Sequence, residues 1–370
     1  MNAPVQGTPA QASEIDTTNP LGTDGFAFVE YSAPTAEGIE ALRRLFLQLG
    51  FTETRKHRSK NVFLFQQERI NFVLNAEPGS HAAEFARAHG PSACAMAWKV
   101  ADARQAYDRA VECGATPVDV PVGEGEVGIP AVEGIGGSLL YFVDDKLDGE
   151  GRSIYDIDFA PIEGRSAGDN SVGLQVLDHL THNVDRGQMD VWAGFYTRLA
   201  NFRELRYFDI AGKKTGLYSR AMTAPCGKMH IPINESADDN SQIAEFLREY
   251  NGEGIQHLAM ATDDIYATVR ALKANGIQFL TTPDTYYEKV GQRVPNHEEN
   301  LDELRELNLL VDGGPDQGVL LQIFTETVIG PIFFEIIQRK GNDGFGEGNF
   351  KALFESIEED QIRRGVLKDD

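Results

Sequence analysis

LQVLDHLTHN (174–183) is one of three short apolar segments whose residue pattern is typical of a buried β-strand. The other two are GIQHLAMATDD (254–264) and IFFEIIQ (332–338). Each segment contains one residue able to bind a metal, and these residues are equally spaced along the chain: His179, His257 and Glu335. The pattern predicts that three rigid strands bring these side chains to one ion.

The chemistry of these residues points to a particular class of metal site. Two imidazoles and one carboxylate suit an octahedral metal and leave three neighbouring coordination positions open. This ligand set is the facial triad of non-heme Fe(II) oxygenases, in which the open positions receive substrate and O₂. The predicted cofactor is therefore Fe(II), and the same ligand types also permit Mn(II) or Co(II).

Composition and charge exclude several classes of partner. The chain has 370 residues, enough for two domains that each bury a core. Its formal net charge of −23 argues against nucleic acid and an anionic membrane surface, because both require a basic face. The few cysteines lack a disulfide or zinc-binding pattern and fit a reducing compartment: Cys94, Cys113 and Cys226.

The N-terminal sequence predicts neither export nor membrane insertion. The first twenty residues, MNAPVQGTPAQASEIDTTNP, lack the basic region and the apolar stretch of a signal peptide. No segment of the chain approaches the length of an apolar membrane span. We expect a disordered tail over residues 1–23 and a cytoplasmic protein.

The two halves of the chain repeat one pattern of strands and helices. FAFVEYSA (26–33) matches LDHLTHNV (177–184), residues 95–115 match residues 257–277, and SLLYFVD (138–144) matches PIFFEII (331–337). The first-half residues assigned as equivalents of the three proposed ligands are side chains unsuited to such a site: Phe28, Ala95 and Tyr141. One half is therefore predicted to bind the metal and the other half to be structural.

This repeat predicts an α+β fold of two tandem domains. Each domain is expected to contain two paired βαβββ modules, which form a curved, barrel-like mixed sheet with helices outside. The predicted parts are the tail (1–23), a structural module pair without metal (24–150), a linker (151–172) and a catalytic, metal-binding module pair (173–370). A C-terminal helix is expected to lie over the second domain.

Each proposed ligand has a structural alternative. On a strand, His179 and His182 point to opposite sides, and we prefer His179 because it has an equivalent in the repeat. Either could instead be a satisfied core histidine. A carboxylate in so apolar a strand is costly unless it is paired or metal-bound, and the alternative partner of Glu335 is Arg339 or Lys340. The remaining histidines receive no role: His57, His81, His89, His230 and His297.

Several long motifs occur in a characteristic order. They are LDHLTHNV (177–184), SRAMTAPCGKMHIPINES (219–236), GIQHLA (254–259), LLQIFTETVIGPIFFEIIQRKG (320–341) and GFGEGNFKALFESIEE (344–359). Together they resemble the 4-hydroxyphenylpyruvate dioxygenase family of the vicinal-oxygen-chelate superfamily. The resemblance implies Fe(II)-dependent, O₂-using oxidative decarboxylation and ring hydroxylation of 4-hydroxyphenylpyruvate to homogentisate, in tyrosine catabolism. It also implies a homo-oligomer, either a dimer or a tetramer.

The resemblance further implies which residues form the site. It places Fe(II) on His179, His257 and Glu335. The polar positions that match the family's site are Ser219, Asn234, Gln242, Gln256 and Gln322; its aromatic lining is matched by Phe324, Phe333, Phe345 and Phe350, and its C-terminal segment by Asn349. Structural alternatives stay open for three of them: a core position for Phe333, an outward direction for Gln256 and an ordinary first-turn position for Gln242.

The C-terminal helix predicted over residues 349–365 has an amphipathic face. This face either packs on the domain or acts as a lid that moves on the glycines of residues 341–348 and excludes water.

Three other functions remain open. A 4-hydroxymandelate synthase would use the same scaffold and substrate, and the resemblance implies that an aromatic side chain at Phe324 favours attack on the ring instead. An extradiol catechol dioxygenase would share the triad but not the C-terminal motifs. A metal-free binding protein on the same modules would lack the triad.

Overall fold

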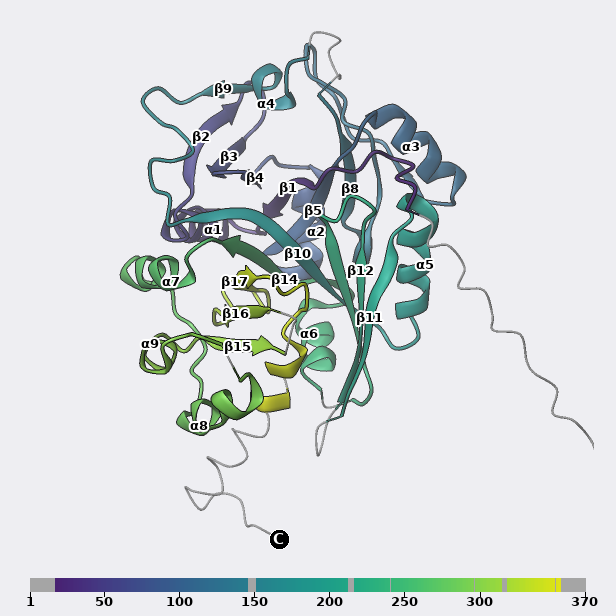
Figure 1. Ribbon diagram of the computed structural model, residues 1–370. Coiled ribbons are helices and arrows are strands. Elements are labelled where there is room, and N and C mark those ends of the chain that lie inside the picture. Colours follow the sequence, from purple (N-terminus) through teal and green to yellow (C-terminus); the bar gives the residue numbers. More distant parts are fainter. Residues whose placement is uncertain are drawn as a thin grey trace, which may run out of the picture.

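Two mixed β-sheets with helices on their outer sides form the protein, as the computed structural model shows (Figure 1). The structure describes residues 17–145, 151–211, 216–239, 241–295, 297–314, 318–349 and 351–353. Among these residues, no helix combines the length and the apolar character needed to cross a membrane. The two sheets confirm the predicted α+β architecture of two related halves.

The first sheet has nine strands in the order β6-β7-β8-β5-β1-β4-β3-β2-β9. Their bounds are β1 (Phe26–Ser32), β2 (Thr52–His57), β3 (Val62–Gln67), β4 (Ile70–Asn75), β5 (Ser92–Lys99), β6 (Pro117–Val118), β7 (Ala131–Glu133), β8 (Leu139–Val143) and β9 (Phe159–Pro161). The helices of this half are α1 (Ala36–Gln48), α2 (His81–His89), α3 (Ala103–Glu112), α4 (Ile154–Ile157) and the 3₁₀ turn η1 (Ile135–Gly137). Thr35, Ser80 and Asp102 begin the three long helices by accepting a backbone N–H.

The second sheet has eight strands in the order β11-β12-β13-β10-β14-β17-β16-β15. Their bounds are β10 (Leu174–Val184), β11 (Arg203–Ala211), β12 (Gly216–Thr223), β13 (His230–Ser236), β14 (Gly254–Thr262), β15 (Leu310–Gly313), β16 (Val319–Phe324) and β17 (Phe333–Lys340). The helices are α5 (Met189–Ala200), α6 (Gln242–Tyr250), α7 (Ile265–Ala274), α8 (Asp284–Arg293) and α9 (Leu301–Leu307).

The central strands of the two sheets have the same connectivity. Strand β1 is parallel to β4 and antiparallel to β5, as β10 is to β13 and β14. In the second sheet, His179 and Glu335 both pair with Ala259, from opposite sides of β14. The three predicted ligands therefore come from three adjacent strands.

The first sheet contains the same register without ligands. Phe28 and Tyr141 both pair with Ala97 of β5. This arrangement matches the second sheet residue by residue, so the correspondence of Phe28 with His179 and of Tyr141 with Glu335 is confirmed. The match of SLLYFVD with PIFFEII is wrong by one residue, because it places Phe142 opposite Glu335. The rings of Phe28 and Tyr141 contact each other, with centroids 5.7 Å apart.

Apolar side chains fill the inner side of the first sheet at the place where the second sheet has its polar cluster. The buried group there includes Phe28, Leu64, Ala97, Leu139 and Tyr141. Burial of apolar area stabilises a fold by about 25 cal/mol per Å². The first half thus uses the position for packing rather than for coordination.

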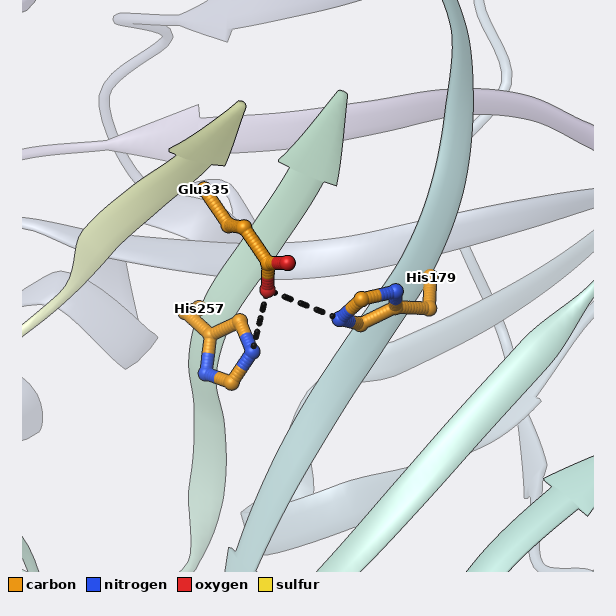
Figure 2. Close-up of side chains that lie close together, drawn as sticks. All are labelled: His179, His257 and Glu335. Carbon is orange, nitrogen blue, oxygen red and sulfur yellow. Dashed lines mark ion pairs between the residues drawn. The ribbon is translucent and has the colours of Figure 1, made fainter. Parts of the chain in front are cut away.

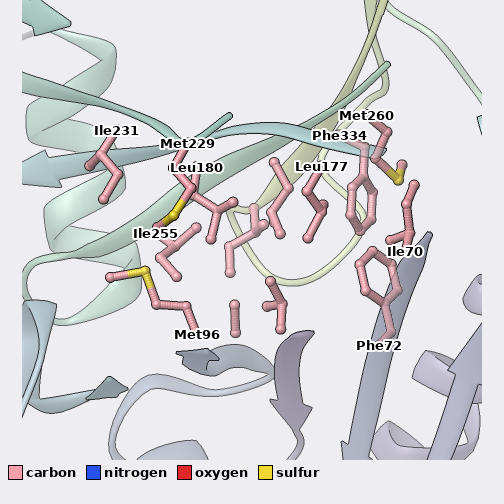
Figure 3. Packing of buried hydrophobic residues seen from close by; sticks show 14 of the residues in the cluster. Ile70, Phe72, Met96, Leu177, Leu180, Met229, Ile231, Ile255, Met260 and Phe334 are labelled. Atoms are coloured by element: carbon pink, nitrogen blue, oxygen red, sulfur yellow. The ribbon is translucent and has the colours of Figure 1, made fainter. Parts of the chain in front are cut away.

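The outer sides of the two sheets pack against each other in one core. Figure 3 shows Ile70, Phe72 and Met96 of the first half facing Leu177, Leu180, Met260 and Phe334 of the second. The Phe72 and Phe334 rings are stacked at 6.0 Å. This shared core packs against the outer side of the strands whose inner side carries the site.

Two segments differ from the expected domain boundaries. Leu21, placed in the predicted tail, is only 4% exposed and packs in the core, because the chain around it hydrogen-bonds to Lys99 and Ala101. Strand β9, placed in the predicted linker, pairs with β2 and completes the first sheet. The predicted C-terminal helix lies outside the described residues beyond residue 353.

Candidate metal centre

His179 on β10, His257 on β14 and Glu335 on β17 point toward one another (Figure 2). The Nε2 atom of His179 lies 3.2 Å from Glu335 Oε2, and that of His257 lies 3.5 Å from the same oxygen. All three side chains are buried. The structure thus brings together the three residues that the sequence singled out.

These donors fit a bound metal ion. One donor atom from each residue lies within 4.8 Å of the others, and within the described part of the chain this is the one group of three or more such side chains. Two neutral imidazoles and a carboxylate can bind one divalent cation, which would offset the cost of burying the carboxylate charge. The geometry therefore supports a metal-binding site.

Hydrogen bonds from outside the triad orient both imidazoles. The Nδ1 atom of His179 is 2.8 Å from Asp178 Oδ1, and that of His257 is 2.9 Å from Gln256 Oε1. An acceptor at Nδ1 holds the proton there and leaves Nε2 free to coordinate. Thr181 Oγ1 lies 2.9 Å from His257 Nε2, on the cavity side.

A bulge in β14 explains the position of Gln256. Thr181 pairs with His257, whereas the next residue of β10 pairs with Ile255, so Gln256 is an extra residue in the ladder. Bulges change the direction of side chains and are common beside functional sites. A regular strand would have turned Gln256 away from the site.

The carboxylates around His179 favour its protonated form. Burial opposes the charged form of His179, but the Glu335 and Asp178 carboxylates outweigh it and raise the pKa of His179 to about 9. Burial lowers the pKa of His257. Burial would raise the pKa of Glu335, yet His179 outweighs it and lowers that pKa. A divalent cation would displace the His179 proton, because metal ligands must be deprotonated.

Four predicted lining residues lie directly against the triad. Gln322 is fully buried, and its Nε2 donates to Glu335 Oε1 at 3.4 Å. Phe333 stacks on the His257 ring at 4.8 Å, and Phe324 meets both rings edge-on. Phe345 meets the His179 ring edge-on at 5.5 Å.

The predicted polar residues Ser219 and Asn234 lie further along the same face. They pair with each other across β12 and β13, and Asn234 Nδ2 donates to Asn183 Oδ1 at 3.3 Å. Asn183 alternates with Thr181 and His179 along β10, so all three face the cavity. The Nδ2 of Asn183 is buried and has no partner among the described residues, which marks a place for a ligand acceptor.

Two other predicted residues are not placed at the cluster. Gln242 is exposed in the first turn of α6, after the Ser241 N-cap. Phe350 lies outside the described residues. Asn349, by contrast, is buried, and its Nδ2 donates to Gln322 Oε1 at 3.0 Å.

Two histidines that were not predicted as ligands lie on β10 and on its neighbour β13. His182 faces the opposite side of β10 from His179 and contacts Tyr196 of α5, as the strand argument predicted. His230, which received no role, lies beside the site: it pairs with His179 in the sheet, and its ring meets that of Phe345.

Sequence reasoning missed the partner of Asp178. Arg339 was considered as a partner for Glu335, but its Nε and Nη2 donate to Asp178 at 2.7 and 2.8 Å. The available signal was Asp178 itself, because a carboxylate inside an apolar strand requires a partner.

Two family models match the chain. Residues 17–160 match the description "Hydroxyphenylpyruvate dioxygenase, HPPD, N-terminal", and residues 176–301 match "Glyoxalase/Bleomycin resistance protein/Dioxygenase superfamily". The second match contains two of the three predicted ligands.

Relatives of known name extend over nearly the whole chain. A 4-hydroxyphenylpyruvate dioxygenase of Pseudomonas aeruginosa is 70% identical over 96% of this chain and 99% of its own length. Hemolysin VllY of Vibrio vulnificus is 63% identical over 95% of this chain and 99% of its own length. A solved structure of a 4-hydroxymandelate synthase mutant from Streptomyces coelicolor has a TM-score of 0.75 at 26% identity and covers 93% of this chain and 100% of that one.

Proposed function

Because the chain belongs to the 4-hydroxyphenylpyruvate dioxygenase family, we infer that it is an enzyme that converts 4-hydroxyphenylpyruvate and O₂ to homogentisate and CO₂. We assign Fe(II) as its metal and His179, His257 and Glu335 as the ligands. The observation that carries this assignment is the convergence of three buried donors on adjacent strands.

The substrate class fits the number of open positions. His179, His257 and Glu335 would hold the metal, and a 2-oxo acid would offer it two further oxygen donors, from its carboxylate and keto groups. When bound, Fe(II) supplies the electron transfer to O₂ that the protein's own side chains cannot provide. One oxygen atom enters the new carboxylate and the other enters the ring, so atoms balance without an external oxo acid.

The residues around the triad hold the ligands and shape the substrate slot. Gln322 donates to Glu335 and fixes the direction of its carboxylate. Phe324 and Phe333 meet at 5.9 Å, edge to face, and form an apolar wall suited to an aromatic ring. Phe345, 8% exposed, covers His179 and limits the access of water.

We assign the far end of the inner face to the phenol hydroxyl. Ser219 and Asn234 lie there beside Asn183, whose Nδ2 has no partner among the described residues. This end of the cavity therefore offers hydrogen-bond donors in an otherwise apolar slot. A few fixed polar groups in an apolar pocket orient a ligand and give specificity. Gln242 remains a predicted contact that this conformation does not bring to the site.

The 4-hydroxymandelate synthase reaction is the competing outcome on this scaffold. A relative that is 70% identical is named as a dioxygenase, whereas the synthase structure is 26% identical. Phe324 is the residue assigned to steer attack to the ring, since it borders both His257 and Phe333. Phe324→Ile is expected to divert product toward hydroxymandelate, and an unchanged ratio by chromatography would remove Phe324 from this role.

Anaerobic Fe(II) reconstitution followed by O₂ addition tests the assignment directly. Wild-type protein is expected to bind one iron per chain and to form homogentisate from 4-hydroxyphenylpyruvate. His257→Ala is expected to lose both properties, while His297→Ala, outside the cluster, keeps them. Catechols serve as control substrates for extradiol activity, and wild-type protein that binds no iron would refute the metal assignment.

Assembly is a prediction of the family assignment, and location is a prediction from the N-terminal sequence. We expect a homodimer or a homotetramer, which sedimentation measurements would detect. We expect a cytoplasmic location, which fractionation of the producing cells would test.

A further inference from the structure

Two hydrogen-bonded paths connect the triad to residues 342–349, which we call the C-terminal segment. The first path begins at His179, whose Nδ1 meets Asp178. Asp178 accepts two hydrogen bonds from Arg339. Arg339 then donates through Nη1 to the carbonyl oxygens of Asn342 at 3.1 Å and Gly344 at 2.6 Å.

The second path begins at Glu335. Gln322 donates to this carboxylate and accepts from Asn349 Nδ2. The Tyr286 hydroxyl in turn donates to Asn349 Oδ1 at 2.6 Å. Two of the three proposed metal ligands are therefore connected to opposite ends of the same short segment.

The segment also packs closely over the site. The Arg339 guanidinium lies 5.4 Å from the centroid of Phe345, whose ring covers His179. Gly346 has a φ of +74°, and a Cβ there would lie 1.6 Å from Gln322 Oε1. This approach of backbone to Gln322 is possible only without a side chain.

We propose that Arg339 is a positioning residue that couples occupation of the metal site to closure of the C-terminal segment. Its planar guanidinium donates to Asp178 with one edge and to two backbone carbonyls with the other nitrogen, which a lysine cannot reproduce. A cation that restricts the motion of the His179 ring also restricts Asp178 and Arg339 through their hydrogen bonds. Arg339 in turn holds the backbone carbonyls of the C-terminal segment. The proposal rests on the proposed metal site.

The coupling is reciprocal. If the bound metal favours the closed segment, then disrupting the segment's attachment must weaken metal binding by the same factor. Outer partners of metal ligands typically change metal affinity by about 10- to 100-fold. The expected loss in an Arg339 variant lies in this range.

The test compares Arg339→Lys with Lys340→Gln in full-length protein. Arg339→Lys keeps a cation beside Asp178, so the buried carboxylate is not left unpaired. Lys340 is the next residue of β17, and its side chain pairs with Glu299 away from the triad, which makes it the matched control. A second variant, Asp178→Asn with Arg339→Gln, removes both charges and keeps the pair neutral.

Two measurements decide the outcome, and neither requires turnover. Co(II) titration of the metal-free protein is expected to show about 10-fold or greater weakening in both Arg339 variants and none in Lys340→Gln. Hydrogen–deuterium exchange is expected to slow across residues 342–349 when Co(II) binds the wild type, and to remain fast in the Arg339 variants.

The results separate this proposal from the proposed function. Wild-type protein that fails to bind Co(II) would refute the metal site itself. Tight Co(II) binding in folded Arg339 variants, or exchange of residues 342–349 that Co(II) does not change in the wild type, would refute only the coupling. If Arg339→Lys does not fold, the neutral double variant supplies both measurements.

Discussion

Glu30 of β1 provides a prediction about the first half of the protein. Its side chain lies on the inner side of the first sheet, 6% exposed, and accepts a hydrogen bond from Asn75 Nδ2 at 2.7 Å. Burial raises the pKa of Glu30 from 4.5 to about 7, although Asn75 and Lys60 oppose the shift. The folded protein therefore holds this carboxyl group protonated at pH values at which the unfolded chain has released the proton.

The sign and size of the effect follow from linkage. Between pH 4.5 and 7 the unfolded state loses the Glu30 proton while the folded state keeps it, so the free energy of unfolding falls as pH rises. At about 1.4 kcal/mol for each pKa unit, the whole shift corresponds to about 3 kcal/mol. Glu30→Gln keeps an acceptor for Asn75 and removes the titration. It should therefore be more stable than the wild type at pH 8 by about 2–3 kcal/mol, with most of the gain absent at pH 5.

Urea unfolding followed by circular dichroism at pH 5 and pH 8 measures this difference. Glu124→Gln is the control, since Glu124 is an exposed glutamate of the same half. A gain for Glu30→Gln that is equal at both pH values, or no gain at pH 8, would contradict a buried, protonated Glu30.

Three further predictions concern the site and the core behind it. Gln322→Leu removes the donor to the metal-site carboxylate, and isothermal titration should show Co(II) affinity reduced by about 10-fold with the fold retained. Gly346→Ala should lower kcat/KM and destabilise the segment, because its Cβ would collide with Gln322; Gly341→Ala, at a similar φ of +80° but with no atom nearer than 3.8 Å, separates the collision from backbone strain. Phe72→Ala should cost about 3–5 kcal/mol in chemical unfolding, since its fully buried ring stacks on Phe51 and on Phe334, and a cost below 1 kcal/mol would contradict this packing.

The internal repeat predicted the fold and the three residues that the structure brings together. Side chains along a strand point to alternate faces of the sheet, with a period of two residues. A correct alignment of two strand segments therefore also aligns the side chains on each face. This is why Phe28 could be matched with His179 before any contact was known. It is also why His179 rather than His182 was predicted to face the cavity. The match of SLLYFVD with PIFFEII was one residue out of register, and only the sheet pairing establishes Tyr141 as the equivalent of Glu335.

Local pattern failed where a position depends on an irregularity or a loop. The bulge that turns Gln256 toward His257 requires one extra residue relative to the neighbouring strand, and a single strand's sequence does not reveal it. Gln242 matched a family position, yet its place at the start of α6 leaves it exposed in this conformation. Leu21 looked like part of a polar tail because one apolar residue creates no periodic signal.

The sequence by itself predicted the identity, order and facing of the three residues that meet at the proposed metal site, because strand periodicity and the repeat are local properties of the chain. Only the tertiary structure decided how these ligands are supported. Arg339 and Asp178 are 161 residues apart, and nothing along the chain distinguishes this pairing from one between Arg339 and Glu335. Which carboxylate pairs with Arg339 depends on which strands become neighbours and on where their charged groups lie. Once the two charges are buried, losing either partner would be strongly destabilising.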